Sequence, residues 1–154
     1  MNLKYMGSKS RIAKHIVPII QNYINENNIE KYVEPFVGGA NVIDKVQCKE
    51  KYGFDKNKYL IALLKQVQSG EELYEEVPKD LYEKARTAFN NGDTSEFEDW
   101  EIGNIGFIAS FNGRWFDGGY AKTGYEKTKN GLRLRNYYTY FDLWIKRYTK
   151  RLSY

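Results

Sequence analysis

The residues best suited to chemistry lie in the stretch 32–42, which reads YVEPFVGGANV and combines the acid Glu34 with the adjacent glycines Gly38 and Gly39. At the carboxyl end of a parallel strand, glycines let the backbone turn sharply and let a ligand approach closely. Free N–H groups at the start of a following helix face the same crevice. The pattern therefore predicts a site for a nucleotide-like ligand.

The rest of the sequence narrows the kind of ligand. The phosphate-binding patterns G-x-G-x-x-G and G-x-x-x-x-G-K-S/T are absent, so neither an NAD site nor a phosphate loop is expected. Asp55 follows Gly39 by sixteen residues, at the end of the next predicted strand, where a carboxylate can accept hydrogen bonds from ribose hydroxyls. Glu34 could hold an ammonium group or attract a sulfonium. An adenosyl group bearing an amino acid meets these demands together, so we expect S-adenosylmethionine as the cofactor.

Helices and strands alternate in the part of the chain that must position these residues. The expected elements are a helix over residues 8–24 that is kinked or broken near Pro18, strands over 31–37 and 51–55, and helices over 41–48 and 57–67. This order predicts a parallel sheet in an α/β domain. From Ser69 the chain becomes acidic and helical in pattern, so we expect two parts, residues 1–70 and residues 71–154.

Charge is unevenly distributed, with a net charge of +5 over residues 1–70, −8 over 71–101 and +7 over 102–154. The last segment also holds 13 of the 25 aromatic residues, a mixture that favours nucleic-acid binding, although a basic face over an aromatic core would give the same pattern. The single Cys48 and single His15 predict no disulfide and no metal site. No apolar run approaches the ~20 residues that cross a bilayer, so a cytoplasmic protein is expected.

Three segments, read in chain order, resemble the opening of the Dam-type, phage-like DNA adenine methyltransferases: KYMGSK at 4–9, VEPFVGGANV at 33–42 and GFDKN at 53–57. The resemblance implies a partial Rossmann-like domain of the kind that uses S-adenosylmethionine, over residues 1–70, followed by a mostly helical target-recognition segment over 71–154. It also implies a set of cofactor-binding residues: Tyr5, Gly7, Lys9, Glu34, Pro35, Phe36, Gly38, Gly39 and Asp55.

Simpler roles for some of these residues remain open. Gly38 and Gly39 would also suit a plain strand-to-helix turn, and Asp55 would also suit the cap of the helix predicted over residues 57–67. Tyr5, which stands where the family often has tryptophan, and Phe36 would also suit an ordinary core.

Residues 110–121, SFNGRWFDGGYA, look like the glycine- and aromatic-rich part of the target-recognition region in phage-type members. An arginine there offers a fork for guanine or phosphate, and aromatic rings can stack on bases or wedge between them. The DNA-binding residues predicted in this way are Arg114, Trp115, Tyr120, Lys129, Arg133 and Arg135. A local aromatic core remains the alternative for Trp115 and Phe116.

The family aims the adenine amine with an Asp/Asn-Pro-Pro-Tyr/Phe tetrapeptide, and none of the three prolines here, Pro18, Pro35 and Pro78, is next to another. We therefore predict no catalytic residue in this chain. By resemblance the complete enzyme moves a methyl group from S-adenosylmethionine to adenine in duplex DNA, as in restriction-modification systems. We expect this chain to be an N-terminal portion that is inactive alone. A split enzyme, in which a second chain completes the catalytic half, and a remnant of such an enzyme both stay open. The alternative is a catalytically silent DNA-binding or regulatory module.

Overall fold

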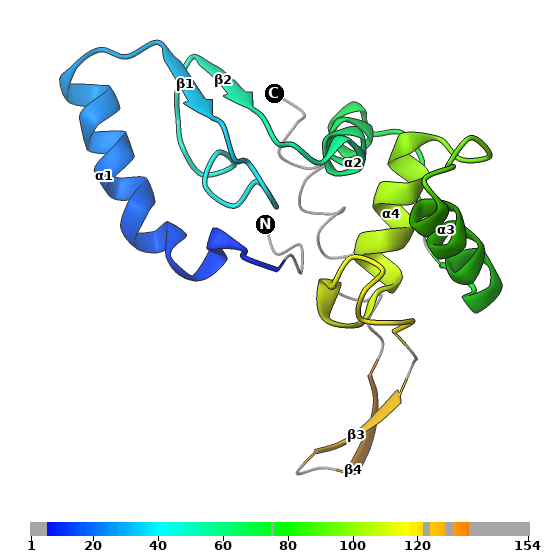
Figure 1. The fold of residues 1–154 in the computed structure, drawn as a ribbon. Helices are drawn as coiled ribbons and strands as arrows, with labels where there is room; N and C mark the ends of the chain where they lie inside the picture. Colours follow the sequence, from blue (N-terminus) through cyan, green and yellow to red (C-terminus); the bar gives the residue numbers. More distant parts are fainter. Residues whose placement is uncertain (1–5, 75, 122–123, 129–130, 136–154) are drawn as a thin grey trace.

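The computed structural model describes residues 6–74, 76–121, 124–128 and 131–135, which form an α/β part, a helical part and a hairpin (Figure 1). The α/β part contains the 3₁₀ turn η1 (Lys9–Arg11), helix α1 (Ala13–Glu26) and strands β1 (Lys31–Glu34) and β2 (Glu50–Gly53). The helical part contains α2 (Lys58–Ser69), α3 (Lys79–Asn91), α4 (Asp99–Ala109) and the 3₁₀ turn η2 (Phe111–Gly113). No helix in the described ranges is long and apolar enough to span a membrane.

Strands β1 and β2 pair in parallel, with Lys31 opposite Glu50 and Glu34 opposite Gly53. The predicted α/β class with a parallel sheet is thus confirmed as a mixed fold with a small parallel sheet. β1 is shorter than the strand predicted over 31–37 and ends at Glu34. Pro35 follows at once, and because proline has no N–H to donate, it cannot continue a sheet ladder.

Helix α1 runs from Ala13 to Glu26 and includes Pro18, so the break predicted there is not observed. A proline removes one backbone hydrogen bond, and packing of the helix can offset that loss. The apolar side of α1, with Ile16 and Ile20 among its residues, packs against the buried side chains of Val42 and Val46.

The helix predicted over residues 41–48 is wrong, because this segment forms only turns between β1 and β2. Side chains occupy backbone groups that a helix would need. The Lys51 ammonium donates to the carbonyls of Ile43, at 3.0 Å, and Val46, at 3.1 Å. Farther along, the N–H of Gln47 donates to the side-chain oxygen of Gln21 at 2.8 Å. One turn keeps local hydrogen bonds, from the Asp44 N–H to Ala40 and from the Val46 N–H to Val42, and beyond it tertiary contacts take the place of helical hydrogen bonds.

The helical part has a core of its own, formed where α2 and α3 pack on α4. Leu60 and Leu63 of α2 share one buried cluster with Phe107 and Ile108 of α4. The packing therefore crosses the boundary predicted near residue 70, since α2 shares its core with residues beyond 100. Gly103 permits this close crossing, because a Cβ built there would fall against the Tyr59 carbonyl oxygen and within 3.0 Å of the Leu63 Cβ.

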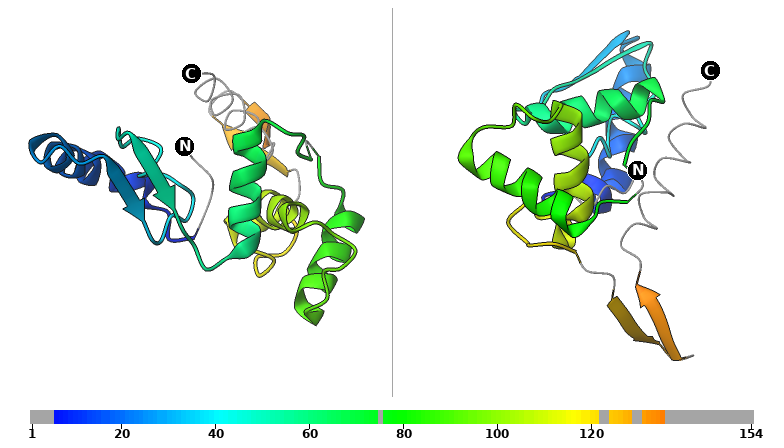
Figure 2. Two further views of the ribbon diagram at one scale, coloured as in Figure 1. Left: turned by 90° about the horizontal axis from the view of Figure 1, so that it is seen from above. Right: turned by 90° about the vertical axis from the view of Figure 1, so that its right-hand side faces the viewer.

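An antiparallel hairpin, β3 (Gly124–Thr128) and β4 (Gly131–Arg135), projects from the helical part (Figures 1 and 2). The sequence led us to expect only turn-rich aromatic stretches here, so the hairpin was missed. Its strands are short and rich in charged residues, which gives only a weak local strand signal. Residues 136–152 have a helix-like pattern in sequence, and this segment lies outside the described residues.

A Gly103→Ala substitution tests the packing of α2 on α4. Although alanine favours a helix more than glycine does, the added methyl group must push α2 away, so we expect a net loss of about 1–3 kcal/mol in the free energy of unfolding. Urea denaturation measures this change. Thr87→Ala, at an exposed position within α3, is the control and should change stability by less than about 0.5 kcal/mol. Equal stability of the Gly103→Ala variant and the unsubstituted protein would contradict the packing described.

Candidate functional site

The candidate site lies where β1 and β2 end, and a buried carboxylate organises it. Glu34, only 6% exposed, accepts a hydrogen bond from the Lys9 ammonium at 3.1 Å through one oxygen and from the Ile43 N–H at 2.9 Å through the other. Lys9 also donates to the carbonyl of Phe36. The N-terminal motif and the loop after β1, 25 residues apart in sequence, are thereby joined directly.

A second contact joins the same two segments. Asn41 is 2% exposed, and its side-chain N–H donates to the Ser8 hydroxyl at 3.0 Å, while Ser8 also accepts from the N–H of Ser10 at 3.2 Å. The side-chain oxygen of Asn41 is buried and has no hydrogen-bond partner. The sequence analysis quoted Asn41 within the motif but gave it no role. The sequence did contain a signal for such a role, because Asn41 is an amide that directly follows two glycines and an alanine in an apolar stretch.

Asp55 connects the glycine loop to the start of α2. One carboxylate oxygen accepts from the N–H of Gly38 at 3.0 Å, and the other accepts from the N–H of Asn57 at 3.0 Å. Asn57, not Asp55, caps α2, because its side-chain oxygen accepts from the N–H groups of Tyr59 and Leu60. Each Asp55 oxygen takes one of these donors, and a carboxylate oxygen can accept two. The predicted ribose-binding acid thus touches the predicted glycine loop and keeps capacity for a further donor.

The remaining residues predicted to bind cofactor lie around this loop. Gly7 and Gly38 have φ angles of +85° and +49°, in the region that glycine adopts without strain. Pro35 and Gly39 belong, with Gly38, to the loop after β1, and Gly7 belongs to the N-terminal motif. The ring of Phe36 is 76% exposed, so it is not the core residue of the alternative interpretation. Tyr5 lies outside the described residues.

The pKa of the Tyr32 hydroxyl, next to the site, is raised above its ordinary value. Burial is the larger cause and the charge of Glu34 is the smaller one. Tyr32 therefore stays neutral at physiological pH. It packs beside Val42 and Val46 and supports the loop from the side of α1.

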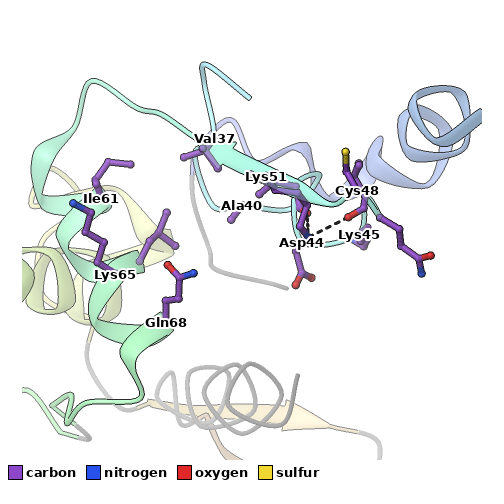
Figure 3. Close-up of a pocket in the computed structure, with 14 residues that line it drawn as sticks. Val37, Ala40, Asp44, Lys45, Cys48, Lys51, Ile61, Lys65 and Gln68 are labelled. Carbon is purple, nitrogen blue, oxygen red and sulfur yellow. Dashed lines mark hydrogen bonds between the residues drawn. The ribbon is translucent and has the colours of Figure 1, made fainter. Parts of the chain in front are cut away.

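A large open pocket of about 830 Å³ lies between the loop region 37–53 and α2, but it contains none of the predicted cofactor-binding residues (Figure 3). Lys45 and Lys51 line it, and both of their ammonium groups already bind backbone carbonyls. A smaller pocket of about 230 Å³ lies at other residues of the motifs. It is lined by Met6, Asn57, Phe107, Gly113, Arg114, Trp115 and Asp117, so the N-terminal motif and the segment after α4 meet there.

The residues predicted to contact DNA fall into two groups. Arg114 is exposed and forms an ion pair with Asp117 at 3.1 Å. Trp115 instead packs against the rings of Phe107 and Tyr59, with ring-centroid distances of 4.4 and 5.8 Å. The Tyr120 hydroxyl donates to the carbonyl of Val77 at 2.8 Å.

The aromatic-core interpretation therefore describes the surroundings of Trp115, and also those of Phe116, which is buried. Arg133 and Arg135 belong to β4, and Lys129 lies outside the described residues.

Comparison with known proteins identifies the family of the chain. The model of the D12 class N6 adenine-specific DNA methyltransferases matches residues 5–114, and the chain therefore belongs to this family. A curated relative is the Type II methyltransferase M.MjaIII of Methanocaldococcus jannaschii, which is 34% identical over 107 residues. The matched region is 57% of this chain and 37% of the relative, so the chain spans little more than a third of that protein. No solved structure matches the chain.

A Lys9→Met substitution tests whether the buried carboxylate depends on its lysine. It leaves Glu34 with an unpaired buried charge, and we expect a loss of about 1–3 kcal/mol in the free energy of unfolding. Lys49→Met is the matched control, because Lys49 and Glu30 form a pair of similar length, 2.9 Å, at the surface, where such pairs contribute less than about 1 kcal/mol. Urea denaturation compares the two. Equal losses in the free energy of unfolding would show that the buried Lys9–Glu34 pair stabilises the protein no more than the surface pair does.

Proposed function

We propose that this chain forms the cofactor-binding and target-recognition portion of an enzyme that transfers a methyl group from S-adenosylmethionine to the exocyclic amine of adenine in duplex DNA. The observation that carries the proposal is the convergence of three motif segments on one loop. Lys9 reaches it from the N-terminal motif, and Asp55 reaches it from the end of β2. Family membership agrees with this function.

The groups at the loop fit an adenosyl ligand that carries an amino acid. Asp55 has acceptor capacity for ribose hydroxyls beyond its two backbone donors. Asn41 offers a buried oxygen without a partner, which suits a donor such as an ammonium group. Gly38 and Gly39 let a ligand approach the backbone, and the exposed ring of Phe36 offers apolar contact. In this proposal the loop completes a partial Rossmann-like cofactor fold.

Glu34 has a positioning role in this proposal. Because its oxygens are held by Lys9 and by the N–H of Ile43, it fixes the shape of the loop on which the ligand rests. This differs from the direct contact with an ammonium group that the sequence suggested. Lys9 neutralises Glu34. Without Lys9, a negative charge would be buried next to the site.

DNA recognition is proposed for the hairpin and for Arg114. A two-stranded β ribbon fits the major groove of duplex DNA, and the β3–β4 hairpin projects from the helical part as such a ribbon (Figure 2). By register, Arg133 pairs with Glu126 and Arg135 pairs with Gly124 across the hairpin. Arginine in these places can neutralise phosphates or read guanine.

In the transfer step, Asp55 and the glycine loop would hold S-adenosylmethionine so that its methyl group can pass to the adenine amine. The cofactor supplies the activated methyl group. The loop residues of this chain hold and orient, which brings the reacting atoms into line. Residues 1–154 contain no Pro-Pro pair, so the tetrapeptide that aims the amine in this family is not among them. We therefore expect no methylation by this chain alone.

The ribose contact is tested by calorimetric titration of S-adenosylmethionine and of its 2′-deoxy analogue. If Asp55 binds the ribose, loss of the 2′-hydroxyl should weaken binding to the unsubstituted protein about 10-fold or more, as expected for a hydrogen bond to a charged group. An Asp55→Ala variant should bind both ligands weakly and with equal affinity. Asp93→Ala, at an exposed position far along the chain, serves as the control. Continued discrimination by Asp55→Ala would exclude the proposed contact.

The DNA contact is tested by measuring duplex binding as a function of salt concentration. Each of Arg133→Ala and Arg135→Ala should reduce the slope of log affinity against log salt by about one, because each phosphate contact contributes about 0.9 to the slope. Lys84→Ala removes a like charge from α3, where it pairs with Glu96, and should leave the slope unchanged. Equal slopes for all variants would rule out these contacts. Binding that is indifferent to S-adenosylmethionine would favour a silent DNA-binding module.

A further inference from the structure

The pocket of about 830 Å³ between the segment 37–53 and α2 has no role in the proposed function (Figure 3). Residues 40 and 43–48 of the turn segment line one side of it, and α2 lines the facing side. Its volume is within the range of about 300–1,000 Å³ that small-molecule sites occupy in proteins. Among the described residues, none that was predicted to bind cofactor or DNA lines it.

The lining of this pocket is positively charged. Lys45 and Lys51 line it from the side of the turn segment, and Lys65 lines it from α2. Asp44 is the one acid among the described lining residues, so three lysines against one aspartate give a net charge of +2. None of the three lysines forms an ion pair with a residue that the structure describes. An anion in the pocket would therefore meet positive charge that no described carboxylate compensates directly.

Two of these lysines are held in place by the backbone of the turn segment. The Lys45 ammonium donates to the Asn41 carbonyl at 2.8 Å, and the Lys51 ammonium donates to the carbonyls of Ile43 and Val46 at 3.0 and 3.1 Å. An ammonium group has three N–H donors, so each of these lysines keeps at least one donor for a ligand. Because carbonyls carry no net charge, these contacts fix the side chains without cancelling their charge. Little further side-chain entropy is then lost when an anion binds.

Apolar side chains lie beside the lysines. Ile43 lines the pocket from the turn segment, Ile61 and Leu64 line it from α2, and all three are only partly buried. Each therefore leaves apolar surface that a ligand can cover. An inorganic anion would leave this surface in water, and a neutral apolar molecule would not use the lysines. The lining favours an organic anion with an aromatic or aliphatic body.

We propose that this pocket is a second ligand site for a small organic anion, whose charged group contacts the lysines and whose apolar body contacts Ile43, Ile61 and Leu64. The site goes beyond the proposed function and does not rest on it. Duplex DNA fits less well as the occupant, because its phosphates would leave the apolar side chains uncovered. The occupant also contacts the segment that supplies the Ile43 N–H to Glu34.

Fluorescence titration of the full chain with the aromatic sulfonate 8-anilinonaphthalene-1-sulfonate tests the proposal. The comparison ligand is the neutral N-phenyl-1-naphthylamine, which has the same aromatic body without the sulfonate. Lys65→Glu reverses one charge of the pocket, and Gln68→Lys adds a charge at an exposed lining position. Lys14→Glu is the matched control, because Lys14 is exposed on α1 and does not line the pocket. Circular dichroism checks that each variant retains its helices.

We expect the unsubstituted protein to bind the sulfonate at least about 10-fold more tightly than the neutral compound. Lys65→Glu should weaken binding of the sulfonate about 5-fold or more, Gln68→Lys should strengthen it about 3-fold, and Lys14→Glu should leave it within about 1.5-fold. Equal affinity for the two compounds, or equal effects of Lys65→Glu and Lys14→Glu, would overturn the proposal. Displacement of the sulfonate by excess S-adenosylmethionine or by duplex DNA would also overturn it, because the pocket would then belong to the cofactor or to nucleic acid.

Discussion

The rest of the candidate site depends on one buried carboxylate and its two donors. Glu34 ends β1, and removing its charge from water is costly unless it is paired. Lys9 provides the opposite charge from the N-terminal motif, and the N–H of Ile43 provides a hydrogen bond from the loop. Because both partners come from outside the strand, satisfying this one group fixes the positions of two separate segments around the end of the sheet.

The need of polar groups for hydrogen-bond partners also explains how the loop after β1 is connected to the rest of the site. Gly38 adopts a left-handed backbone conformation, and its N–H would lack a partner without the Asp55 carboxylate. Asp55 also accepts from the N–H of Asn57, and so the position of α2 is tied to the position of the loop. A ligand bound at the loop would therefore contact groups already held in place, which lowers the entropy lost on binding.

The two parts of the molecule differ in completeness. In the helical part, α4 is buried along most of its length, and aromatic residues such as Tyr82, Trp115 and Phe116 fill the space around it. In the α/β part, apolar side chains lie in the open on a two-stranded sheet. Such a sheet buries too little area to offset the entropy of ordering the chain. The α/β part therefore leaves more apolar surface in contact with solvent than the helical part does.

The sequence by itself determined the parallel strand order, the helices after residue 57 and the identity of the motif residues, because these follow from local periodicity, glycine conformations and capping signals. Other features were decided by tertiary structure alone. The segment 41–48 became a turn because Lys51 and Gln21 bind its backbone groups from elsewhere in the chain. Whether Trp115 faces a base or a core, and whether Glu34 meets a ligand or Lys9, depends on which distant side chains come within a few ångströms. Those distances cannot be predicted from local sequence, because they are set only when separated segments fold against one another.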